Sequence, residues 1–205
     1  MNKLATLIIV YLISLISGCA MYEGGNIPST SLDKSNINIK NKKSLSFTSL
    51  AKGGFSKPSK QPEFAQNIIK GELTTVLEKS GYFSRISTND PEAELKLELI
   101  ITEAGNPAAL IPAFITGLSL YTIPSWATSN YEVNAIIQNK EGRQKKYLLK
   151  DSVTLVQWLP MIFAFPSHDF SVVPKVRKNM YRYLLKQIKD DGFLDKTNTA
   201  ISLTN

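Results

Sequence analysis

Cys19 is the only cysteine of the chain, and its thiol is the group whose position most clearly indicates chemistry. Upstream lie a basic residue, Lys3, an apolar run from Leu4 to Leu15, and small residues directly before the cysteine. This order is typical of a secretory signal peptide. We therefore predict that residues 1–18 are a signal peptide that is removed by cleavage before Cys19. A single cysteine forms no disulfide within the chain, so we expect packing alone to stabilise the fold.

The context Ile16-Ser17-Gly18-Cys19 resembles the signal of bacterial lipoproteins. The resemblance implies that Cys19 becomes the first mature residue and carries a diacylglyceryl group and a further fatty acyl chain such as palmitate. Acyl chains contribute about 0.8 kcal/mol per buried CH2, so two or more of them anchor a protein stably. In such lipoproteins an aspartate after the cysteine causes retention in the inner membrane, so Ala20 favours the periplasmic face of the outer membrane. An uncleaved membrane helix is the alternative, although the apolar run is shorter than the roughly 20 residues that spanning requires.

No other pattern in the sequence brings catalytic or metal-binding groups together. His168 is the sole histidine, and no nucleophile accompanies it in a recognisable motif. The phosphate-binding motif G-x-x-x-x-G-K-[ST] and the hydrolase motif G-x-S-x-G do not occur. A metal site needs convergent histidine, cysteine or carboxylate ligands, and the sequence shows no cluster of them. We therefore expect a protein that is not an enzyme and that holds no metal or other cofactor.

Charge and length restrict the partners and the size of the core. The whole chain carries a formal charge of +7, which falls to +6 when Lys3 leaves with the leader. A basic surface near a bilayer favours anionic lipid head groups or lipopolysaccharide phosphates as partners. An exported, acylated chain does not meet nucleic acid, so we expect no nucleic-acid partner. The 205 residues less the 18 of the leader leave 187, enough for one domain with a hydrophobic core.

Residues 19–36 are predicted to form a flexible tether after the lipidated cysteine, because they contain Gly24-Gly25, Pro28 and several hydroxyl residues. A single domain follows over residues 37–197. Alternating apolar residues indicate its strands, and apolar residues at three- to five-residue steps indicate its helices. The predicted elements are a strand at 38–49, a helix at 62–81, a strand at 95–101, a hairpin of strands 131–138 and 143–156, and a helix at 172–189.

Both predicted helices have one apolar face and end at a glycine, Gly81 or Gly192, that is suited to a left-handed C-cap. The apolar residues are Phe64, Ile68, Leu73, Val76 and Leu77 in the first helix, and Val176, Met180, Leu184 and Ile188 in the last. The order β-α-β-β-β-α predicts an α+β fold, a two-layer sandwich whose mainly antiparallel sheet carries both helices on one face.

This order of elements, with the tether and the lipidated Cys19, resembles the small periplasmic lipoproteins related to the lipopolysaccharide-assembly lipoprotein, and more distantly the amino-terminal domain of TolB. The resemblance implies the fold class and a place in the cell envelope. It lies in the order of elements and not in a motif, so no functional residue is carried over from these families.

Two long segments, residues 104–131 and 152–168, contain no charged side chain, and they flank the predicted hairpin. If the hairpin turns near Lys140 and Glu141, strand pairing places Trp126 near Leu155. By the same register Trp158 lies near Ile123. Both tryptophans are therefore predicted at one end of the sheet, with the basic hairpin tip at the other.

Three interpretations of these segments remain open. A spanning helix from Ala108 to Ala127 has the length, but prolines weaken it, and one crossing would separate strands of the same sheet. The segments could instead extend the core by packing on the helices. In the third interpretation they form an exposed apolar surface that contacts lipid, an acyl-chain ligand or a partner protein. The candidate contact residues are Phe114, Leu118, Trp126, Trp158, Phe163 and Phe165.

Taken together, these observations predict a non-enzymatic, membrane-anchored periplasmic lipoprotein that acts as a binding or assembly module of the cell envelope. Its expected partners are the membrane, through Cys19, and an envelope protein or lipid. The alternatives are a subunit of an envelope export or transport complex, and an immunity or exclusion lipoprotein of a mobile element.

Overall fold

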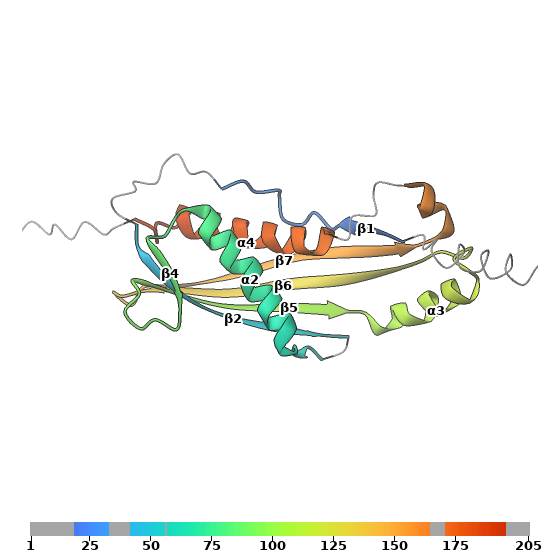
Figure 1. Ribbon diagram of the computed structural model, residues 1–205, viewed down its shortest axis with the longest axis horizontal. Coiled ribbons are helices and arrows are strands. Elements are labelled where there is room, and N and C mark those ends of the chain that lie inside the picture. Colours follow the sequence, from blue (N-terminus) through green and yellow to red (C-terminus); the bar gives the residue numbers. More distant parts are fainter. Residues whose placement is uncertain (1–18, 33–41, 56, 165–170, 196–205) are drawn as a thin grey trace, which may run out of the picture.

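The computed structural model describes residues 19–32, 42–55, 57–164 and 171–195. Within these ranges the chain forms a seven-stranded sheet, two long helices over one face of it, and a short helix alongside one end (Figure 1). The predicted α+β class is confirmed. The leader, Phe165 and His168 lie outside the described residues, and so do the predicted domain limits at 37 and 197.

The sheet is mainly antiparallel, as predicted, but it has more strands than the sequence suggested. Its strands are β1 (Cys19–Glu23), β2 (Ser44–Gly54), β3 (Ser59–Lys60), β4 (Arg85–Thr88), β5 (Leu95–Gly105), β6 (Ser125–Asn139) and β7 (Gln144–Gln157). Their order is β1-β7-β6-β5-β2-β3, with β4 beside β2. Strand β2 runs parallel to β4 and β5, whereas the other pairs are antiparallel. The predicted β-α-β-β-β-α order is matched only loosely, because β1, β3, β4 and a short helix between β5 and β6 were not predicted.

Helices α2 (Glu63–Ser80) and α4 (Val172–Asp190) cover the same face of the sheet (Figure 1). The apolar face predicted for α4 is confirmed, since Val176, Met180, Leu184 and Ile188 are all buried. Gly81 has a φ of 66° and its N–H donates to the carbonyl of Glu78, which confirms the predicted left-handed C-cap of α2.

The apolar face predicted for α2 is wrong at its first two positions. Phe64 and Ile68 are exposed, whereas Ile69 and Leu73 are buried in the core. Helix α2 begins near the β2–β3 edge of the sheet, so its first turns lie at the margin of the sheet and not over its centre (Figure 1). The spacing of these residues is helical, as predicted, but their position relative to the sheet decides which of them are buried.

Strands β6 and β7 form the predicted hairpin, with Ser125 paired to Gln157 and Trp126 paired to Val156, one residue from the predicted partner. The tip of the hairpin is held at the end of α4. The Arg143 guanidinium donates to the carbonyl of Asp191 at 2.7 Å, and Lys145 forms an ion pair with the Asp191 carboxylate at 2.6 Å. This bond to Lys145 lowers the pKa of Asp191 below its ordinary value.

Residues 19–32 do not form the flexible tether that their composition suggested. Cys19–Glu23 forms strand β1, which pairs with β7, and Ala20 and Ile27 are buried. Without β1, strand β7 would present a row of unpaired backbone groups at the edge of the sheet, and β1 satisfies them through its own backbone. This pairing requires no side-chain pattern, so the sequence did not reveal it.

Asn179 of α4 binds the segment that follows β1. Its Oδ1 accepts a hydrogen bond from the Thr30 N–H at 2.8 Å, and its Nδ2 donates to the carbonyl of Pro28 at 3.2 Å. We expect Asn179→Ala to cost about 1–3 kcal/mol locally, because it leaves the Thr30 N–H without its partner. Hydrogen exchange should then accelerate at Thr30 and not in β5–β7. Lys186→Ala, at an exposed position of the same helix, is the control, and unchanged exchange at Thr30 would contradict the prediction.

Candidate functional site

The two uncharged segments meet at one end of the sheet, where α3 (Leu110–Leu118) extends beyond β5 and lies alongside the first part of β6 (Figure 1). They are joined by a hydrogen bond from the Leu159 N–H to the carbonyl of Tyr121 at 2.7 Å. We call the exposed large apolar side chains of this region the apolar end: Leu110, Ile111, Phe114, Ile115, Leu118, Leu120, Ile123, Trp126, Trp158 and Leu159.

Local sequence signals explain the short helix. Asn106 caps the turn before α3, where its Oδ1 accepts a hydrogen bond from the Ala108 N–H at 2.9 Å. Thr116 is the only residue of α3 that is fully buried. After the helix, Leu120 and Tyr121 have φ angles of 52° and 63°, a left-handed conformation that costs bulky residues on the order of 1–3 kcal/mol each. The chain therefore holds an apolar helix and a strained turn at the surface.

The candidate contact residues that can be placed are exposed. Phe114 is 68% exposed, Leu118 70%, Trp126 67% and Trp158 37%. Phe163 lies within the 3-10 helix Leu159–Ala164. The interpretation of the segments as an extension of the core is therefore wrong for Phe114 and Leu118, since neither is covered by the long helices. Whether these residues bind a partner stays a prediction.

The interpretation of residues 108–127 as one spanning helix does not match the fold. This stretch comprises the end of a 3-10 turn, the nine-residue α3, a bent connection and the first residues of β6. Among the described residues, no helix has both the length and the hydropathy that crossing a bilayer demands.

Cys19 lies beside the apolar end. Its backbone pairs with Gln157, which pairs in turn with Ser125, so β1, β6 and β7 come together at this edge. Trp158 directly follows the partner of Cys19, and Trp126 follows Ser125 on the second strand from β1, so both tryptophans lie at the same end of the sheet as Cys19. The thiol of Cys19 is free and partly exposed. The sequence predicted the modification of Cys19 and the convergence of the tryptophans separately, and only β1 brings the two together.

A groove of about 370 Å³ separates α3 from the amino-terminal end of α4. Small and apolar residues of β1, β6 and β7, among them Met21, Ala127 and Leu155, line it together with Leu110 of α3 and Val173 of α4. The long helices leave this part of the sheet uncovered. The groove adjoins the apolar end at Leu110, which belongs to both.

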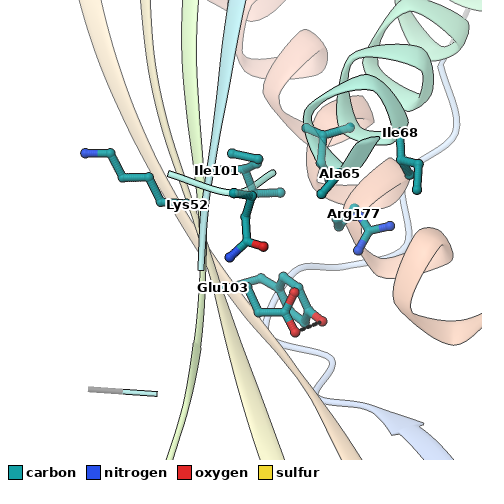
Figure 2. A pocket seen from close by; sticks show the side chains of 10 residues that line it. Lys52, Ala65, Ile68, Ile101, Glu103 and Arg177 are labelled. Carbon is teal, nitrogen blue, oxygen red and sulfur yellow. Dashed lines mark hydrogen bonds between the residues drawn. The ribbon is translucent and has the colours of Figure 1, made fainter. Parts of the chain in front are cut away.

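A second cavity, of about 150 Å³, lies between α2, α4 and the sheet, and several polar side chains reach it (Figure 2). Arg177 points into it from α4 and forms two hydrogen bonds of 2.8 Å with the Glu72 carboxylate, and both side chains are 10% exposed. On the sheet side the Tyr131 hydroxyl donates to Glu103 at 2.9 Å. Burial, and secondarily the charge of Glu103, raises the pKa of Tyr131 far above its ordinary value, so the phenol stays protonated.

The members of the Arg177–Glu72 and Tyr131–Glu103 pairs at this cavity satisfy each other, and neither pair presents an exposed nucleophile or base. Lys52 points away from Arg177 (Figure 2). Within the described part of the chain, no three histidine, cysteine or carboxylate side chains are grouped as metal ligands would be. Sequence reasoning missed the pair of Glu72 and Arg177, which are separated by 105 residues.

Comparisons with known proteins give remote similarities only. No protein-family model and no curated protein matches the chain. Rare lipoprotein B from Shewanella oneidensis has 11% identity and a TM-score of 0.44 over 72% of this chain and 95% of that one. A minor lipoprotein from Acinetobacter baumannii has 15% identity and a TM-score of 0.42 over 73% of this chain and 92% of its own. A DUF4136 family protein from Bacteroides thetaiotaomicron has 12% identity and a TM-score of 0.35, with coverage of 82% and 96%. These values are too low to assign the chain to a family or a function.

Proposed function

We propose that the chain is a lipoprotein of the cell envelope, anchored through Cys19 at the periplasmic face of the outer membrane, and that it acts without catalysis as a binding or assembly module. The observation that carries this proposal is the position of Cys19 in β1, directly beside the apolar end. The residue that the leader marks for acylation and the surface suited to binding are thus adjacent.

The apolar end is the contact surface in this proposal. Contiguous apolar patches on protein surfaces commonly mark sites of interaction with proteins, ligands or membranes. Here the patch includes two aromatic side chains that are more than half exposed, Phe114 and Trp126. It also includes the strained turn at Leu120 and Tyr121, which lies outside the hydrophobic core.

Acylation of Cys19 is tested in cells that produce the full chain with a carboxyl-terminal tag and are fed an alkyne-bearing palmitate analogue. We expect the label on the wild-type chain, recovered in the outer-membrane fraction, and no label on Cys19→Ser. The matched control is Cys19→Ser combined with Ser29→Cys, which restores a thiol ten positions later and should stay unlabelled. An unlabelled wild-type chain with an unmodified thiol would overturn the anchoring proposal.

A further inference from the structure

The strands that meet at the apolar end are uncharged for a considerable distance. Along β6 the first charged residue from this end is Glu132, and along β7 it is Asp151. Trp126 and Glu132 are about 20 Å apart at the rise of a strand residue. The ion pair Glu132–Lys150 lies behind this zone, and the pair Glu23–Lys175 lies in its inner half, level with Val153 and Ser129. The apolar end can therefore enter a layer of low dielectric without burying a charge from β6 or β7.

The position of Cys19 determines what this surface meets. Strand β1 begins at Cys19 itself, so no spacer separates the expected acyl chains from the sheet. Acyl chains on Cys19 bring the bilayer within a few residues of Trp126 and Trp158. If the leader were retained instead, its apolar run from Leu4 to Leu15 would bring the same bilayer to the same place.

We infer that the apolar end inserts into the leaflet that holds Cys19, with Phe114, Leu118 and Trp126 at the boundary between head groups and acyl chains. The inference rests on the proposed anchoring and names the lipid bilayer as the partner of that surface. Tryptophan is enriched at this boundary, and apolar surfaces that dip about 5–10 Å into it are a common mode of interfacial binding.

This arrangement fixes the orientation of the domain. Cys19, the first residue of β1, and α3 form two attachments at one end of the sheet, because Cys19 pairs with Gln157 at the end of β7, and the hairpin tip lies at the other end (Figure 1). Ser125 and Asn139, the ends of β6, are about 45 Å apart at the rise of a strand residue. The basic tip with Arg143, Lys145 and Lys146 therefore projects away from the lipid surface.

Intrinsic fluorescence provides the test, because the chain has only two tryptophans, Trp126 and Trp158. The acylated full chain is reconstituted into vesicles of phosphatidylethanolamine and phosphatidylglycerol, with or without lipids that are brominated on their acyl chains. In Trp158→Phe, which leaves Trp126 as the only reporter, we expect brominated lipid to quench at least half of the emission. Trp126→Phe reports on Trp158 in the same way. In both variants, quenching by aqueous acrylamide should be weak.

The control carries its only tryptophan on the same sheet but far from the apolar end. It combines Trp126→Phe, Trp158→Phe and Leu148→Trp, at a position of β7 that is 56% exposed. Its emission should respond to acrylamide and not to brominated lipid. If Trp126 behaved like this control, the bilayer would be excluded as the partner. Protection of Trp126 from both quenchers would also overturn the inference, since a protein or a second copy would then cover the surface.

Acylation is measured separately, by the mass of the peptide that contains Cys19, and an unmodified mass would mean that the proposed anchoring fails. The Cys19→Ser chain, which keeps its apolar leader and also carries Trp158→Phe, is reconstituted in parallel. Quenching of its Trp126 by brominated lipid supports insertion even where acylation is absent, and lack of quenching contradicts insertion even where acylation is present.

Discussion

Replacing Glu72 with alanine is expected to lower the free energy of unfolding by about 3–5 kcal/mol, because it leaves the Arg177 guanidinium buried without a partner. The two side chains form two hydrogen bonds of 2.8 Å, and each is only 10% exposed. The pair joins α2 to α4 above the sheet, so its loss is expected to loosen the helical layer as a whole.

Urea unfolding followed by circular dichroism measures this effect. Glu78→Ala, at an exposed position of the same helix, is the control and should change stability by less than about 0.5 kcal/mol. The double variant Glu72→Leu with Arg177→Met should recover most of the loss, because it removes the uncompensated charge and keeps the packing volume. A loss below about 1 kcal/mol in Glu72→Ala would show that water reaches Arg177 and that the pair is not a buried one.

The second large effect is expected at the apolar end. In the mature chain with Cys19→Ser, so that no acyl chain contributes, replacing Phe114 and Leu118 with aspartate should weaken vesicle binding by about a hundredfold. Each apolar side chain contributes about 1.5 kcal/mol or more when it leaves water, and 1.4 kcal/mol corresponds to a factor of ten. Folding stability should stay nearly unchanged, since both side chains are about 70% exposed in the structure.

Co-sedimentation with vesicles measures the binding, and thermal unfolding checks the fold. Leu148→Asp removes a large apolar side chain that is 56% exposed in the middle of β7, and it should leave vesicle binding intact. Equal loss of binding in this control would indicate a nonspecific effect of added negative charge. Unfolding of the Phe114 and Leu118 variant would instead assign these residues to the core.

Local patterns in the sequence predicted most of the elements. The alternation of Leu95, Leu97, Leu99 and Ile101 indicated a strand with one buried face, and all four side chains are buried in β5. Gly81 ends α2 in the left-handed conformation because only glycine adopts it at no steric cost. Such features depend on neighbours within a few residues, so a single sequence contains the information for them.

Finding the candidate site required both the sequence and the tertiary structure. The sequence by itself determined that Cys19 follows an apolar run and that two segments lack charge, since these properties belong to the residue types and their order. Only the tertiary structure decided that β1 pairs with β7 and brings Cys19 to Trp126 and Trp158, because backbone pairing at a sheet edge has no side-chain pattern. It also decided that Phe114 and Leu118 are exposed, because an apolar residue is buried only where another element covers it, and α2 and α4 do not extend over α3.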